Sequence, residues 1–213
     1  MNHQVFGRRK MTIEEFLEIP VDVFNNEIKG KKFYYVNREE EDPYNFRKIG
    51  DYYSVSVAKG GKSWPINIDH VISINDVQAM NPMTQAIAGM ISDLHQRDVY
   101  CNLYIAENPN ADSFQIHIDE TDNFILMVDG AMKLNLYGNE YQGPEHYLQD
   151  EPELLESIIL RKGDFCYIPK YSYHSAKSLT SRISMSCYVE QPSTYNNVKR
   201  TVYYDPKKNP NQH

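Results

Sequence analysis

The part of the sequence that most limits the fold runs from Val99 to Val189, where short apolar or alternating runs follow one another. Residues that favour turns separate these runs, among them Gly130, Gly163 and Pro169. Strands are therefore expected at about 99–106, 113–119, 123–128, 131–137, 156–161, 164–168, 173–178 and 182–189. Short strands at this spacing are typical of a barrel or of two packed antiparallel sheets. We predict a double-stranded β-helix, or jelly roll, for this part of the chain.

The residues before this core are expected to cover one of its outer faces. Thr12 and Glu15 fit a capping box, which predicts a short helix over about 12–19. Between positions 75 and 95, apolar residues recur every three or four positions, which predicts one long helix that Pro82 starts or kinks. Extended segments are expected at 32–36, 52–58 and 66–74.

The chain shows no repeat, low-complexity tract or linker that would divide it. We therefore predict a single domain over residues 1–213. A cover of helices and strands would occupy 1–98, the jelly-roll core 99–190, and a C-terminal strap 191–213.

Composition and charge narrow the class of protein. The net charge of -7 argues against a general nucleic-acid-binding protein, because binding to phosphates needs a basic surface. No apolar run approaches the length that spans a membrane, and the N-terminus has no secretory apolar segment. Cys101, Cys166 and Cys187 lie inside apolar runs and form no CxxC pair, which favours buried thiols in a reducing compartment. We predict a cytoplasmic protein.

The most informative motif is His117-Ile118-Asp119. Residues i and i+2 of a strand point the same way, so this motif presents an imidazole and a carboxylate together. With 7 histidines and 29 acidic residues in the chain, roughly one H-x-[DE] motif is expected by chance, so the motif needs structural context. Ser113 and Gln115 would share the face of the motif while their neighbours are apolar, as in a strand that lines a polar cavity.

His174 is the expected third member of the site. It follows a Gly-Asp turn, a short strand and a turn that contains Pro169, which is how a jelly roll brings a second ligand-bearing strand to a metal. Two imidazoles and a carboxylate on one face of an octahedral ion leave three positions open. That arrangement suits non-haem iron(II) with a chelating cosubstrate and dioxygen. The alternative is a polar barrel lining with ordinary hydrogen-bonded histidines.

Residues 101–138 and the later GDFCYIP motif resemble the core of JmjC-type, cupin-fold 2-oxoglutarate oxygenases, in particular the ribosomal-oxygenase subgroup. The resemblance covers about residues 99 to 190 with its motifs in the family's order. Its matching residues are Asn102, Tyr104, Phe114, His117, Asp119, Phe124, Leu126, Gly130, Tyr137, Gly163, Asp164, Tyr167, Pro169 and His174. It implies a mainly β fold with an α-helical N-terminal cover and a cupin-like core.

By this resemblance, His117, Asp119 and His174 are the ligands of Fe(II), and 2-oxoglutarate is the cosubstrate. The resemblance also implies a dioxygenase that hydroxylates a protein or peptide side chain, or alternatively a small molecule, with release of succinate and CO2. Asn102, Tyr104 and Asn123 would face the cosubstrate or the substrate.

One departure from the family pattern concerns the base that pairs with the distal carboxylate of 2-oxoglutarate. The family usually places it two residues after the glycine that matches Gly130, where this chain has Met132 and carries Lys133 one position later. A shift by one residue sends a side chain to the other face of a strand, so Lys133 would need a bulge to reach the site. Arg182, followed by Ser184, is the other candidate, because arginine suits bidentate recognition of a carboxylate.

The second departure is length, since ribosomal oxygenases carry a helical dimerisation region and a winged-helix domain after the barrel. This chain is too short for them, so a ribosomal substrate is not expected to follow from the fold. Two other functions compete with the oxygenase. One is a non-catalytic cupin-fold protein that binds a ligand or partner and has lost 2-oxoglutarate binding, which Met132 favours. The other is a cupin dioxygenase that chelates its own substrate. Substrate and oligomeric state stay open.

Overall fold

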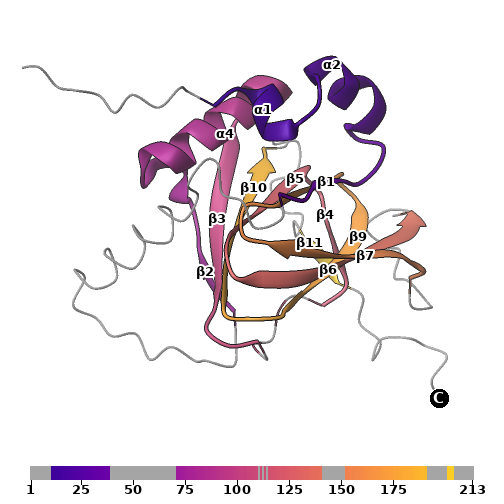
Figure 1. The fold of residues 1–213 in the computed structure, drawn as a ribbon. Helices are drawn as coiled ribbons and strands as arrows, with labels where there is room; N and C mark the ends of the chain where they lie inside the picture. Colours follow the sequence, from indigo (N-terminus) through magenta and orange to yellow (C-terminus); the bar gives the residue numbers. More distant parts are fainter. Residues whose placement is uncertain are drawn as a thin grey trace, which may run out of the picture.

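The computed structural model describes residues 11–38, 71–109, 111, 113, 115–140, 152–190 and 201–203. Two antiparallel sheets form the centre of this structure, with strand orders β1-β8-β5-β10-β3-β2 and β11-β4-β9-β6-β7 (Figure 1). The strands are β1 (Tyr34–Val36), β2 (Ile72–Ile74), β3 (Val99–Ala106), β4 (His117–Asp119), β5 (Asn123–Asp129), β6 (Ala131–Glu140), β7 (Leu154–Arg161), β8 (Phe165–Ile168), β9 (Ser172–Ser178), β10 (Arg182–Val189) and β11 (Thr201–Tyr203). From β3 to β6, and again from β7 to β11, consecutive strands alternate between the two sheets, which confirms the predicted jelly roll.

The helices begin and end near the predicted signals. They are α1 (Ile13–Leu17), α2 (Val21–Val23), the π-helical turn η1 (Phe24–Ile28), the 3-10 turn η2 (Val77–Ala79) and α4 (Pro82–His95). The capping box is present, because the Thr12 hydroxyl accepts from the Glu15 N–H at 3.2 Å and the Glu15 carboxylate accepts from the Thr12 N–H at 2.8 Å. Pro82 starts α4 rather than kinking it. No helix in the described part of the chain is long and apolar enough to cross a membrane.

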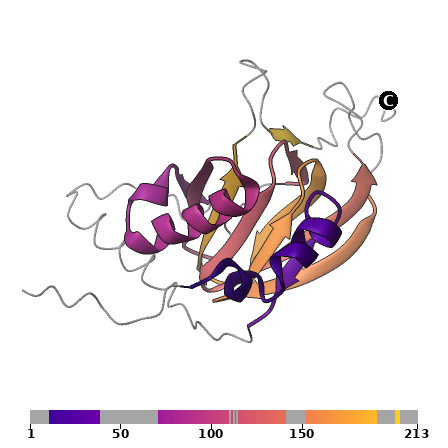
Figure 2. The ribbon, with the colours of Figure 1, turned by 90° about the horizontal axis from the view of Figure 1, so that it is seen from above.

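The helices cover the outer face of the six-stranded sheet, as predicted (Figure 2). Phe16 of α1 stacks on Phe165 of β8 with ring centroids 4.6 Å apart, and Phe24 packs against Tyr167 at 5.0 Å. A second apolar cluster lies between the two sheets and consists of Ile125, Met127, Met132, Leu134, Leu136, Ile158, Leu160, Cys166 and Ile168. All three cysteines are buried free thiols, which also agrees with the sequence.

Some predicted elements differ from the structure or lie outside its described residues. The strand expected at 113–119 is regular only from His117, and the one expected at 66–74 is regular over Ile72–Ile74, with 66–70 outside the described residues. The predicted strand at 52–58 also lies outside them. In the C-terminal strap, β11 pairs with β4 and places Tyr203 opposite His117.

Gly130 connects β5 to β6 in a conformation that other residues rarely adopt. Its φ is 73°, and a Cβ atom there would lie 2.1 Å from the carbonyl oxygen of Ser181. We expect Gly130→Ala to lower the free energy of unfolding by more than about 1 kcal/mol, since left-handed backbone alone costs a side chain about 1–2 kcal/mol. Gly89 in α4 is the matched control, because no atom lies within 4 Å of its Cβ position. There alanine should stabilise by about 0.5–1 kcal/mol. Urea unfolding measures both, and a change of the same sign in both variants would contradict the prediction.

His95 at the end of α4 should make stability depend on pH. Its ring packs against Phe24 and Phe124, and burial together with the nearby Lys29 ammonium lowers its pKa to about 4, although Asp122 opposes this. Between pH 6.5 and 4 the unfolded chain therefore takes up a proton that the folded protein refuses, so stability falls as the pH falls. The fall in the free energy of unfolding from pH 7 to pH 5 should be about 1–2 kcal/mol smaller in His95→Leu than in the unsubstituted protein. Equal differences in the two proteins would refute this role.

Candidate metal centre

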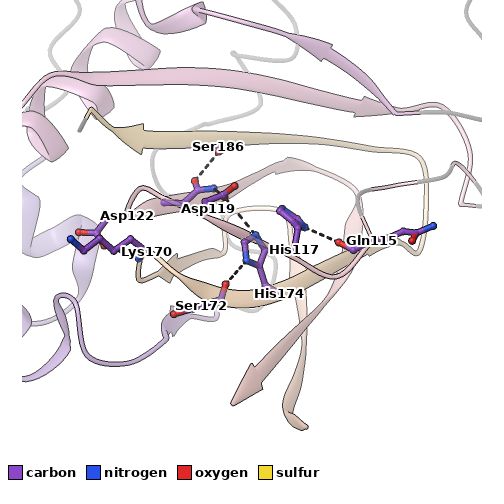
Figure 3. Close-up of polar contacts among 9 residues, drawn as sticks. Gln115, His117, Asp119, Asp122, Lys170, Ser172, His174 and Ser186 are labelled. Carbon is purple, nitrogen blue, oxygen red and sulfur yellow. Dashed lines mark hydrogen bonds and ion pairs between the residues drawn. The ribbon is translucent and has the colours of Figure 1, made fainter. Parts of the chain in front are cut away.

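The jelly-roll register brings His117, Asp119 and His174 together (Figure 3). The strands β4 and β9 are antiparallel neighbours in which His117 lies directly opposite His174, so both rings project from the same face. Their ring centroids are 4.2 Å apart, and His174 Nε2 lies 3.7 Å from Asp119 Oδ2. One nitrogen or oxygen from each residue lies within 4.8 Å of the others. The spacing and the donor set fit a single metal ion held on one face.

Backbone carbonyls orient both imidazoles. His117 Nδ1 lies 2.7 Å from the carbonyl oxygen of Gln115, and His174 Nδ1 lies 3.0 Å from that of Ser172. A carbonyl can only accept a hydrogen bond, so in the neutral rings Nδ1 carries the proton and Nε2 has the lone pair. Histidine ligands of metals are commonly oriented in this way.

The charge state of the site also suits a metal. Burial of His117, together with the neighbouring His174, lowers the pKa of His117 to about 4, while the Asp119 carboxylate opposes this shift. His117 is therefore neutral at pH 7. Metal ions bind the neutral imidazole, so no proton has to leave this ring at neutral pH.

Two contacts hold the turn before His174 against the motif strand. The backbone N–H of Tyr171 donates to the carbonyl oxygen of Asp119 at 2.7 Å, and the N–H of Lys170 donates to the Asp122 carboxylate at 3.0 Å. Figure 3 shows Asp122 and Lys170 beside the site. The turn thereby fixes where β9 begins, and with it the position of His174.

The three residues open onto a cavity between the sheets. Its lining combines hydroxyl and amide groups with a few apolar side chains and one cation: Tyr104, Ser113, His117, Asp119, Asn123, Ile125, Met132, His174, Ala176, Arg182, Ser184 and Ser186. Tyr104, Asn123 and Ser184, which the sequence assigned to the site, are among these lining residues. Asn102 shares the face of Tyr104 on β3 but does not line the cavity, and its side-chain oxygen accepts from the N–H of Asp76 at 3.2 Å.

Arg182 is a buried cation surrounded by hydroxyls. Its side chain is 4% exposed and donates to the hydroxyls of Ser178 at 2.9 Å, Ser113 at 3.4 Å, and Ser184. No carboxylate of the described part of the chain pairs with it. Burial lowers its pKa to about 10, which still leaves it charged at pH 7. A buried charge without a counter-ion is costly, so this position is suited to a bound anion.

Lys133, the other candidate, lies on the opposite face of β6. Met132 is 1% exposed and faces the cavity, whereas Lys133 does not line it. The register of β6 runs unbroken over 131–136 against β7 and over 132–136 against β9. The bulge that would have turned Lys133 inward is therefore absent, and strand alternation keeps this side chain outside the cavity.

Sequence reasoning missed three of the polar or small residues around the cavity: Ser178, Ser186 and Ala176. The serine at 186 could have been found, because it continues the every-second-residue pattern of Arg182 and Ser184 on β10. Two tyrosines, Tyr171 and Tyr173, lie beside His174 in the sequence. Tyr171 is 38% exposed, whereas Tyr173 is buried in a cluster with Ile118.

Comparisons with known proteins agree with this geometry. The family model described as JmjC domain matches residues 74–197. NO66 from Drosophila mojavensis, described as a bifunctional lysine-specific demethylase and histidyl-hydroxylase, is 25% identical over 132 residues, which are 54% of this chain and 15% of that protein. NO66 from Drosophila erecta is 26% identical over 147 residues, 59% of this chain and 21% of that protein.

Solved structures share the fold. YcfD from Escherichia coli, described as a ribosomal oxygenase in complex with cobalt and succinic acid, superposes with a TM-score of 0.58 and 18% identity. That match covers 80% of this chain and 51% of YcfD. The non-heme alpha ketoglutarate dependent carbocyclase SnoK from nogalamycin biosynthesis gives a TM-score of 0.56 and 13% identity, covering 80% of this chain and 82% of SnoK. The chain thus spans about half of YcfD and 15% and 21% of the two NO66 proteins.

Proposed function

We propose, from the premise that this chain belongs to the JmjC domain family, that it is an iron(II)- and 2-oxoglutarate-dependent hydroxylase. The observation that carries the proposal is one cavity with two features. It contains a group of two histidines and one aspartate, and it contains Arg182, a buried cation that no described carboxylate neutralises. The two histidines and the aspartate would hold a metal ion that a 2-oxo acid can chelate. The buried cation would pair with the distal carboxylate of that acid.

Each residue then has a defined task. His117, Asp119 and His174 would hold Fe(II), with the Nδ1 protons on the Gln115 and Ser172 carbonyls keeping both Nε2 lone pairs available. Together with bound 2-oxoglutarate, the iron would supply the oxidation by dioxygen, with release of succinate and CO2. Because three protein ligands leave three octahedral positions, the site has room for a chelating cosubstrate and for dioxygen.

Arg182 would bind the distal carboxylate of 2-oxoglutarate. Its Nε and Nη1 groups donate to Ser178 and Ser184, which fixes the plane of the guanidinium. The hydroxyls that accept these bonds keep their own protons, which they can donate to a carboxylate. The Met132, Ile125 and Ala176 side chains would pack against the methylene groups of the acid. Tyr104 would add a phenol to the same wall.

We propose a protein or peptide side chain as the substrate. The names of the NO66 proteins and the description of YcfD as a ribosomal oxygenase support this class. A small molecule is the alternative, and SnoK, a biosynthetic carbocyclase with the same fold, favours it. We further propose a cytoplasmic protein, since its three cysteines are free thiols.

The test is the formation of succinate from 2-oxoglutarate by the iron-loaded protein, with and without oxygen. Oxygen-dependent succinate, rising when a peptide library that carries the substrate is added, is the expected result. Metal binding without turnover, with or without candidate substrates, would favour the non-catalytic binding protein. Met132 supports that second candidate, because it stands where the family usually carries its base.

A further inference from the structure

A chain of two hydrogen bonds, one buried and one partly buried, leads from β10 to the carboxylate of the candidate metal centre. The Ser186 hydroxyl donates to Asn123 Oδ1 at 2.7 Å, and Asn123 Nδ2 donates to Asp119 Oδ2 at 3.2 Å. Asn123 is 6% exposed and Ser186 is 5% exposed. Hydrogen bonds in such surroundings are strong and are costly to leave unmade.

We propose that Ser186 and Asn123 form a relay that holds the Asp119 carboxylate in its metal-binding orientation, an inference that rests on the proposed function. Asn123 is the residue that touches the carboxylate, and Ser186 acts only through Asn123. In this relay both act as positioning residues for Asp119.

Ser186 is needed because an amide has two different ends. By donating to Oδ1, the hydroxyl leaves the NH2 group of Asn123 to face Asp119. If the amide turned over, its oxygen would face the carboxylate, which would be repulsive. The Ser186 hydroxyl therefore fixes the amide in the orientation in which its NH2 group donates to the Asp119 carboxylate.

The register of β5 and β10 explains how the relay is positioned. Ser186 lies opposite Ile125, two residues from Asn123, so Ser186 and Asn123 are diagonal neighbours on the cavity face. Asn123 in turn starts β5 only four residues after Asp119, across a tight connection. One serine on the six-stranded sheet thus supports a ligand on the other sheet.

The relay has a consequence for coordination. Oδ2, the carboxylate oxygen that accepts from Asn123, is also the oxygen that lies 3.7 Å from His174 Nε2, so the hydrogen bond fixes the side of the carboxylate that faces the imidazole. If Asp119 supplied one oxygen to the metal, three octahedral positions would remain, two for a chelating acid and one for dioxygen.

The experiment measures Co(II) binding by calorimetry and by visible absorption under anaerobic conditions. Ser186→Ala and Asn123→Ala should each raise the dissociation constant for Co(II) by about 10–100-fold, the usual effect of losing an outer-shell partner. The double variant should bind no more weakly than Asn123→Ala alone, because Ser186 acts through Asn123. Ser186→Thr keeps the hydroxyl and should bind near the unsubstituted value, which separates the relay from a loss of folding. In the variants that bind Co(II) more weakly, the visible absorption spectrum of bound Co(II) should also differ from that of the unsubstituted protein.

Ser175→Ala is the matched control. This serine follows His174 but bonds to Asn135 and Tyr137 outside the cavity, so Co(II) affinity should not change. A Ser186→Ala protein that binds Co(II) as well as the unsubstituted protein, or a double variant with additive losses, would overturn the relay alone. If the unsubstituted protein fails to bind Co(II), the proposed function and the relay are overturned together.

Discussion

Replacing Arg182 with methionine is expected to raise the dissociation constant for 2-oxoglutarate by at least about thirtyfold, because removing one member of a buried charge pair costs about 2–5 kcal/mol. The arginine is 4% exposed and its described partners are neutral hydroxyls, and no other lysine or arginine of the described residues lines the cavity. Methionine preserves much of the volume and removes only the charge and its donors. Calorimetric titration of the Co(II)-loaded protein with 2-oxoglutarate measures the change.

Lys133→Met is the matched control for this prediction. This substitution removes a cation from β6, the strand on which the family usually carries its base. The Lys133 side chain lies on the face of β6 that does not line the cavity. Its affinity for 2-oxoglutarate should equal that of the unsubstituted protein. Arg182→Lys keeps a charge without the planar fork and should bind with intermediate affinity. A loss confined to Lys133→Met would show that the carboxylate binds elsewhere.

His174→Ala should remove Co(II) binding at concentrations that saturate the unsubstituted protein. Losing one of three direct ligands should cost more than the roughly 10–100-fold that an outer-shell partner costs. Succinate formation should fall below detection in the same variant. Equilibrium dialysis against Co(II) measures the binding, and turnover is measured separately.

His95→Leu is the control for the loss of a buried histidine. His95 lies outside the cavity, where α4 packs on the outer face of the six-stranded sheet, and its ring contacts Phe24 and Phe124. This variant should retain Co(II) binding. Retention of metal by His174→Ala, or loss of metal in both variants, would contradict the assignment of His174 as a ligand.

The grouping of His117, Asp119 and His174 could be predicted from the sequence because strand alternation is local. The two-residue period places His117 and Asp119 on one face, and the order of turns and strands leads the third residue to the neighbouring strand. The same regularity made the jelly roll predictable, since apolar runs and turn residues marked nearly every core strand.

The choice between Arg182 and Lys133 could not be made from the sequence. A bulge inverts the side of every residue after it, and nothing in the sequence around Gly130 excludes one. Only the unbroken register of β6 places Met132, rather than Lys133, in the cavity.

The partners of the site residues were also beyond the sequence, because they depend on packing between distant strands. Ser178 and Ser113 meet Arg182 from segments that no local pattern connects. Ser186 reaches Asn123 only because β10 lies beside β5. Asn102 shares the cavity face of its strand, but its side-chain oxygen accepts a hydrogen bond from the N–H of Asp76, the residue before η2.

The most direct test of the proposed function is an anaerobic crystal structure of the protein with Co(II) and 2-oxoglutarate. We expect a metal bound by His117, Asp119 and His174 and chelated by the 2-oxo acid, with the distal carboxylate paired to Arg182. A cavity in which Met132 blocks the cosubstrate, or a carboxylate bound away from Arg182, would contradict it.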